Sequence, residues 1–107
     1  MIIQGANEPV IIKFDSDIDI SSFKDIHVSL VNKHSKKIMK HWSKSDITID
    51  GCFCICPLSQ QDTIQFIIGE CYIEVKWLDH IGYVCFAKPI NDEVIYRGDR
   101  DIMKWED

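Results

Sequence analysis

The sequence is dominated by short runs in which apolar and polar residues alternate with a period of two. In the clearest run, four apolar side chains fall on one side of the backbone, at Cys71, Ile73, Val75 and Trp77. Strict alternation is typical of a strand with one buried face, whereas an amphipathic helix repeats every 3.6 residues. The chain is therefore predicted to consist almost entirely of half-buried strands.

Turn residues separate these runs at a spacing of roughly 8–12 residues, which is typical of all-β domains. The predicted strands are 8–14, 25–32, 36–42, 47–49, 52–57, 71–77, 83–89 and 93–96. Asp50-Gly51 is the strongest hairpin signal, because glycine accepts the positive φ of a tight primed turn. A further turn is expected at Asn91-Asp92. Ser59, followed three residues later by Asp62, resembles a helix N-cap and predicts one short helical turn near 59–66.

About seven or eight antiparallel strands, with no alternating βα units, predict an all-β fold that closes as a β-sandwich or small barrel. A chain of 107 residues is close to the commonest domain size. We expect one domain over residues 1–96, followed by a charged C-terminal tail over residues 97–107.

Charge and apolar runs narrow the function classes. A formal net charge of -5 argues against binding to a phosphate backbone, which needs a basic patch. The apolar runs are too short to span a membrane, and the N-terminus carries no targeting signal. Five cysteines, an odd number, do not form a paired disulfide framework. We expect synthesis in the cytoplasm, no nucleic-acid partner and no membrane partner.

Cys52, Cys54 and Cys56 alternate along one predicted strand. Alternate strand positions lie about 6.5–7 Å apart, too far for one metal ion to take all three thiolates without a sharp bend. Buried cysteine behaves as a small apolar residue, so this run is interpreted as core packing, with Cys71 and Cys85 filling the same interior. The alternative is a metal-binding regulatory or enzymatic domain that uses this run together with a histidine.

No catalytic constellation is recognisable in the sequence. His27, His34, His41 and His80 do not form a ligand motif, since two fall in predicted turns and two on predicted solvent-facing strand sides. There is no activated nucleophile signature and no glycine-rich phosphate loop. The prediction is a protein that is not an enzyme, without catalytic, cofactor-binding or metal-binding residues and without a cofactor.

The positive signals concern surfaces. If Cys54 and Cys56 point inward, Phe53 and Ile55 point outward together with Pro57, which makes an apolar strip on the surface. Contiguous exposed apolar area usually marks a protein contact. Tyr72 on the outer side of its strand and Trp105 in the charged tail are similar candidates. The predicted protein interface therefore comprises Phe53, Ile55, Tyr72 and Trp105.

A carbohydrate-binding β-sandwich is a second alternative, because tryptophan side chains form stacking platforms. The candidates are Trp42, Trp77 and Trp105. Trp77 alternates with the apolar residues of its strand, which favours a position in the core.

Four segments resemble those of small prophage proteins of Firmicutes. They are IQG with a following EP at residues 3–9, WSKSDITIDG at 42–51, PLSQQDT at 57–63 and VKWLDHIG at 75–82. In this order and spacing they are similar to the immunoglobulin-like N-terminal domain of phage baseplate upper proteins, over roughly residues 1–96.

The resemblance implies an immunoglobulin-like β-sandwich that serves as a structural module of a phage tail or baseplate. Its partners would be other phage structural proteins and further copies of itself, which would make the protein virion-associated. Baseplate upper proteins continue into a long stalk, whereas this sequence stops at Asp107. This difference favours a minor structural or accessory subunit.

Overall fold

The computed structural model describes residues 2–15 and 18–86, together with the backbone of residues 90–96. The strands are β1 (Ile2–Ile3), β2 (Val10–Lys13), β3 (Asp25–Asn32), β4 (Ile38–Trp42), β5 (Thr48–Asp50), β6 (Phe53–Cys56), β7 (Gly69–Leu78), β8 (Val84–Phe86) and β9 (Ile90–Tyr96). The helical elements are η1 (Ile20–Ser22), η2 (Lys44–Asp46) and α1 (Gln60–Ile64). The prediction of a mainly β chain is confirmed.

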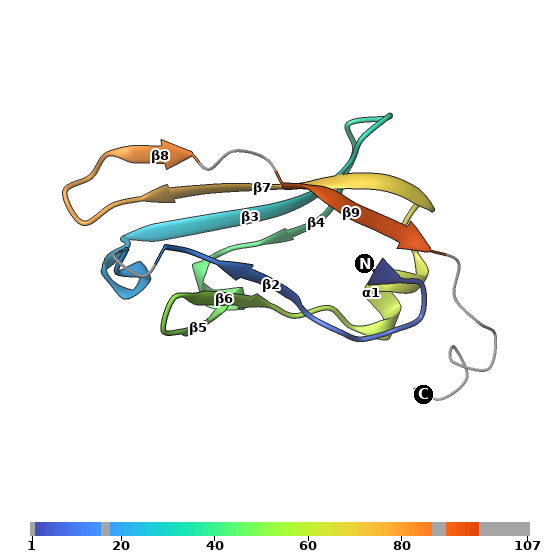
Figure 1. Ribbon diagram of the computed structural model, residues 1–107, viewed down its shortest axis with the longest axis horizontal. Coiled ribbons are helices and arrows are strands. Elements are labelled where there is room, and N and C mark those ends of the chain that lie inside the picture. Colours follow the sequence, from blue (N-terminus) through green and yellow to red (C-terminus); the bar gives the residue numbers. More distant parts are fainter. Residues whose placement is uncertain (1, 16–17, 87–89, 97–107) are drawn as a thin grey trace.

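The strands form two sheets that face one another (Figure 1). Sheet A has the order β1-β9-β7-β3-β4, with β8 also paired to β7, and sheet B has the order β2-β6-β5. Only the two-residue pairing of β1 with β9 is parallel among the strand pairs of the described chain. Strand β3 pairs with β7 over residues 71–78. Strands β8 and β9 therefore follow one another along the opposite edge of β7.

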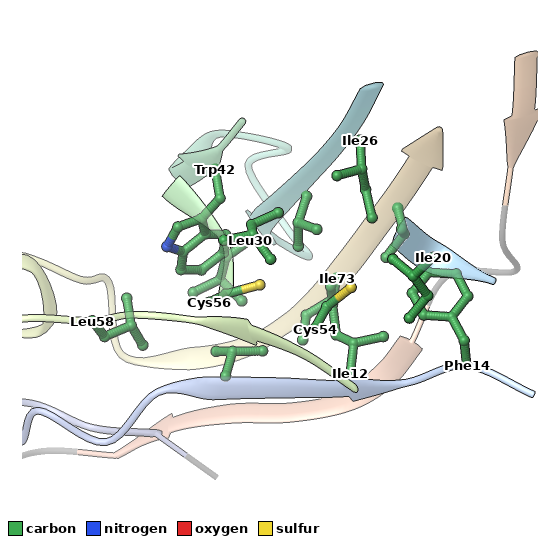
Figure 2. Close-up of a cluster of buried hydrophobic side chains, with 14 of the residues drawn as sticks. Ile12, Phe14, Ile20, Ile26, Leu30, Trp42, Cys54, Cys56, Leu58 and Ile73 are labelled. Carbon is green, nitrogen blue, oxygen red and sulfur yellow. The ribbon is translucent and has the colours of Figure 1, made fainter. Parts of the chain in front are cut away.

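The apolar and polar residues that alternate along the sequence point alternately into the core and toward the surface. Apolar side chains at alternate positions of β2, β3 and β7 are buried on one face, and the residues between them are mostly exposed or half-buried. The exception is Val31, which is also buried, on the other face of β3. The alternate apolar side chains meet the buried side of β6 in the space between the sheets (Figure 2). The largest fully buried side chain is Trp42, whose indole Nε1 donates a 2.8 Å hydrogen bond to the carbonyl of Pro57. Each sheet thus covers the apolar face of the other.

Two local predictions are confirmed by backbone geometry. Gly51 has φ of 59° in the turn between β5 and β6, which is the left-handed conformation that glycine adopts without a steric penalty. Ser59 caps α1: its hydroxyl accepts from the Asp62 N–H at 3.0 Å, and the Asp62 carboxylate accepts from the Ser59 N–H at 3.0 Å. This reciprocal capping box satisfies two donors that the helix start would leave unpaired.

The end of the molecule that carries α1 is joined to the N-terminal segment by hydrogen bonds. The buried hydroxyl of Thr63 donates to the carbonyl of Ala6 at 2.7 Å and accepts from the N–H of Gly5 at 3.0 Å. The side chain of Gln4 donates to the carbonyl of Phe66 at 2.9 Å. We call residues 4–6 and 59–66 the closed end.

Two predictions are wrong. Asn91-Asp92 is not a turn but part of β9, where a register shift places two residues opposite the single residue Tyr72 of β7. A β-bulge of this kind accommodates an extra polar residue without ending the strand. Cys52 and Cys85 do not fill the core: each is half-exposed, Cys52 in the turn before β6 and Cys85 on edge strand β8.

The predicted C-terminal tail over residues 97–107, Trp105 included, lies outside the described residues. Within the described part of the chain, none of the helices combines the length and the apolar character that crossing a membrane requires.

Candidate functional site

The turn between β7 and β8 is organised by one carboxylate. Asp79 Oδ1 accepts hydrogen bonds from the backbone N–H groups of Ile81 (3.0 Å), Gly82 (2.8 Å) and Tyr83 (2.8 Å). Hydrogen bonds to the ionised form, first that from Tyr83, lower the pKa of Asp79 from its ordinary value. Gly82 has φ of 113°, a conformation that side-chain-bearing residues rarely adopt. The turn is therefore specified by its own sequence.

This ordered hairpin carries the most exposed large apolar side chains of the described chain. The exposed fractions are 64% for Ile81, 67% for Tyr83, 62% for Val84 and 73% for Phe86. Single exposed apolar residues are normal on a protein surface, but four within six positions form a patch. We call residues 79–86 the open end, which lies at the opposite extreme of the long axis from α1 (Figure 1).

The three-residue edge strand β8 carries no charged residue and no proline. Proteins discourage unwanted pairing at such edges with charges, prolines or bulges. Edge strand β2 is preceded by Pro9 and ends in Lys13, and edge strand β4 carries Lys40 and has the extra residue Met39 at a register shift against β3. Strand β8 consists of Val84, Cys85 and Phe86, and within the described residues only β7 pairs with it. Its free backbone groups are available to another strand.

An open depression of about 620 Å³ lies on the outer face of sheet A and reaches Phe86 at the open end. Its polar lining comes from three strands: His27 and Ser29 of β3, His41 of β4, and Glu74 and Lys76 of β7. Ile38, Val75 and Phe86 complete the lining. The depression combines titratable groups with an apolar margin, which is the composition of a contact surface or a ligand site.

The two histidines of this depression are connected to each other and to the carboxylate of Asp25. His27 Nε2 lies 3.0 Å from Asp25 Oδ2, and His27 Nδ1 lies 3.0 Å from His41 Nε2. Burial raises the pKa of Asp25, but hydrogen bonds from Ile26 and His27 outweigh it, so the net shift is downward. The ionised carboxylate accepts the Nε2–H of His27, so His27 Nδ1 accepts the Nε2–H of His41 in the neutral pair. We call His27 and His41 the histidine pair.

The structure places the predicted interface residues on different faces. Phe53 (39% exposed) and half-buried Ile55 lie on the outer face of sheet B, as expected from inward-pointing Cys54 and Cys56. Tyr72 lies on the outer face of sheet A, half-buried, with the ammonium of Lys36 5.3 Å from its ring centroid. These three described residues do not form one surface.

The residues of the two alternative functions lie mainly in the core. Cys54 and Cys56 are fully buried, and burial raises the pKa of their thiols to about 11 and about 12. Protonated thiols are poor metal ligands and poor nucleophiles. Among the described residues, no three His, Cys, Asp or Glu side chains are arranged to hold a metal ion.

The two tryptophans among the described residues are equally unsuited to a sugar platform. Trp42 is 1% exposed, and Trp77 stacks on Phe23 with ring centroids 5.4 Å apart. Both rings are therefore used in packing within the protein.

The open end and the histidine pair were not predicted from the sequence. The open end did have a signal in the sequence, because residues 83–86 are four consecutive apolar residues. A strand with one buried face needs an apolar residue only at every second position. The pair had a weaker signal, since His27 and His41 were both placed on outward strand sides. Their contact depends on the register of β3 with β4, which the sequence does not specify.

Comparison of the chain with protein-family models, with curated proteins and with solved structures finds no match.

Proposed function

We propose that this protein is a non-catalytic assembly module that binds protein chains, a second copy of itself included, through the open end. The observation that carries the proposal is the exposure of Ile81, Tyr83, Val84 and Phe86, each above 60%, on a hairpin with an ordered turn. Burying aromatic anchors of this size dominates the binding free energy of most protein interfaces.

The edge of β8 supplies the second element of the proposed contact. An unpaired edge adds a strand from another chain through main-chain hydrogen bonds, and alternate side chains give specificity. Two copies of β8 can pair in an antiparallel manner about a two-fold axis, so that sheet A continues from one copy into the other. Val84 and Phe86 then lie on one face of the joined sheet and meet their counterparts.

We also propose that the fold is an immunoglobulin-like β-sandwich. The support is the strand order: β1-β9-β7-β3-β4 against β2-β6-β5 corresponds to the A′GFCC′ and BED sheets of a variable-type domain. A short helix between the strands that correspond to E and F fits the same order. The inter-sheet disulfide of antibody domains has no counterpart among the described cysteines, all of which are free.

In biological terms, we propose that this assembly module is part of a phage tail or baseplate. This setting rests on the motif resemblance over residues 3–82, and an assembly module with a self-complementary edge suits a particle built from repeated copies.

Sedimentation equilibrium over a concentration series up to about 1 mM tests the function, because weak self-contacts have dissociation constants in or below that range. The apparent mass of the natural chain is expected to rise from monomer toward dimer. The double substitution Tyr83→Ser, Phe86→Ser is expected to weaken the dimer by at least tenfold, since it removes two anchors.

The matched control is the pair Phe53→Ser, Ile55→Ser on the outer face of sheet B, which is expected to leave the dissociation constant unchanged. A natural chain that remains monomeric over the whole series, or a dimer lost only in the sheet B variant, would overturn the proposal.

A further inference from the structure

We propose that His27 and His41 together bind one divalent transition-metal ion of the kind that prefers imidazole ligands: Ni²⁺, Cu²⁺ or Zn²⁺. This site is independent of the proposed self-contact and would exist on the isolated chain.

The first argument is the spacing of the two ring nitrogens. His27 Nδ1 and His41 Nε2 are 3.0 Å apart, while the ring centroids are 5.1 Å apart, so the nitrogens lie between the rings and the rings meet tip to tip. Two imidazole nitrogens bound to one ion at about 2.0–2.1 Å are separated by about 2.9–3.4 Å, depending on whether the angle at the metal is square or tetrahedral. The strands therefore already hold the two donors at the separation of neighbouring ligands.

The second argument is the carboxylate behind His27. Asp25 Oδ2 lies 3.0 Å from His27 Nε2, the ring nitrogen that faces away from His41. Metal-binding histidines almost always donate their second N–H to a carboxylate or carbonyl, which fixes the tautomer and increases the basicity of the ligand nitrogen. Asp25 leaves His27 Nδ1 with its lone pair directed toward His41.

Binding needs little rearrangement. Neutral His41 moves its proton from Nε2 to Nδ1, which frees the Nε2 lone pair without releasing a proton from the pair. Each ring then turns about χ2, a torsion that is broad for histidine, so that both lone pairs converge on the ion. The backbone positions are fixed because both residues belong to paired strands of sheet A.

The surroundings determine the strength and selectivity of the site. No third His, Cys, Asp or Glu among the described residues completes a ligand set, so water occupies the other coordination positions. Glu74 lines the same depression and balances the charge of Lys76 there. Two imidazoles with water favour the later first-row ions over Mg²⁺ and Ca²⁺, which prefer oxygen ligands.

The test is calorimetric titration of the full chain with NiCl₂ in a non-chelating buffer. One ion per chain is expected, and the variants His27→Gln and His41→Gln should each weaken binding at least tenfold. Asp25→Asn should weaken it by about 10–100-fold, the usual effect of losing such a supporting partner. His34→Gln and His80→Gln are the matched controls, because these exposed histidines lie in turns away from the pair.

A second readout identifies the ligands directly. With one equivalent of CuSO₄, the electron paramagnetic resonance spectrum should show coupling to two equivalent imidazole nitrogens, reduced to one in either variant. Cys52→Ser and Cys85→Ser should leave this spectrum unchanged. The proposal is overturned if Ni²⁺ does not bind, or if binding survives in His27→Gln and His41→Gln.

Discussion

The two ends of the molecule both satisfy their polar groups with hydrogen bonds, but they differ in the exposure of an aromatic side chain. At the closed end, Thr63 satisfies both a carbonyl and an N–H of the N-terminal segment, and Phe66 is 5% exposed. At the open end, the turn is equally well hydrogen-bonded through Asp79, yet Phe86 is 73% exposed. Both ends are ordered, but the closed end buries the ring of Phe66, whereas the open end leaves its four large apolar side chains exposed.

The hydrogen bonds at the two ends therefore have different consequences. Hydrogen bonds at the closed end hold α1 and the N-terminal segment over the core, so they contribute to the stability of the fold. The bonds to Asp79 hold a turn that covers nothing, so their consequence is to keep Tyr83 and Phe86 in a fixed arrangement on the surface. A fixed apolar surface loses little conformational entropy on binding, which favours association.

The sharpest test of the comparison makes the same substitution at each end. Phe66→Ala is expected to lower the free energy of unfolding by about 3–5 kcal/mol, because it leaves a cavity in the core. Phe86→Ala is expected to change it by about 0.5 kcal/mol or less, since the ring is already in water. Urea denaturation monitored by circular dichroism measures both values. Equal losses in the two variants would erase the distinction between the ends.

A smaller effect is expected from the hydroxyl at the closed end. Thr63→Val keeps the shape of the side chain but leaves the N–H of Gly5 and the carbonyl of Ala6 without this partner. The expected loss is about 1–3 kcal/mol in the free energy of unfolding, the cost of buried unsatisfied groups. Thr48→Val on the exposed side of β5 is the control and should be nearly neutral. A neutral Thr63→Val would mean that the N-terminal segment is not held by this contact.

The smallest effect is a local pH dependence at the open end. The pKa of Asp79 is lowered in the folded chain, so the stabilisation it gives the turn is complete above the ordinary value of about 4. It is lost as the pH falls through the lowered pKa. Hydrogen exchange should show the amides of residues 81–83 losing protection in that range while those of 63–66 keep theirs.

The variant Asp79→Asn lacks this titratable carboxylate, so the protection of its amides at residues 81–83 should not depend on pH in this range. If the natural chain and this variant lose protection at the same pH, the carboxylate does not control the turn.

The strands were predictable because alternation is a local property of the sequence. The face shared by Val10 and Ile12, the exact bounds of β3, the turn at Gly51 and the capping box at Ser59 all follow from residues within a few positions of one another. Each of these signals names a conformation without reference to the rest of the chain.

The remaining features depend on pairing between distant segments. The parallel contact of Ile2 with Ile95 and the bulge at residues 91–92 arise only when β9 aligns with its neighbours. The histidine pair likewise requires Ser29 to lie opposite His41, which brings His27 within reach on the diagonal. Exposure of the open end depends on the strand order of sheet A, which leaves β8 paired with β7 alone among the described strands.

Backbone-amide NMR of the ¹⁵N-labelled chain during serial dilution tests the central claim most directly, because it reports which residues change environment as copies separate. We predict concentration-dependent shifts at residues 79–86, with the amides of the closed end unchanged. Shifts confined to residues 59–66 or to the outer strip of β6, or no shifts at any concentration, would contradict the account.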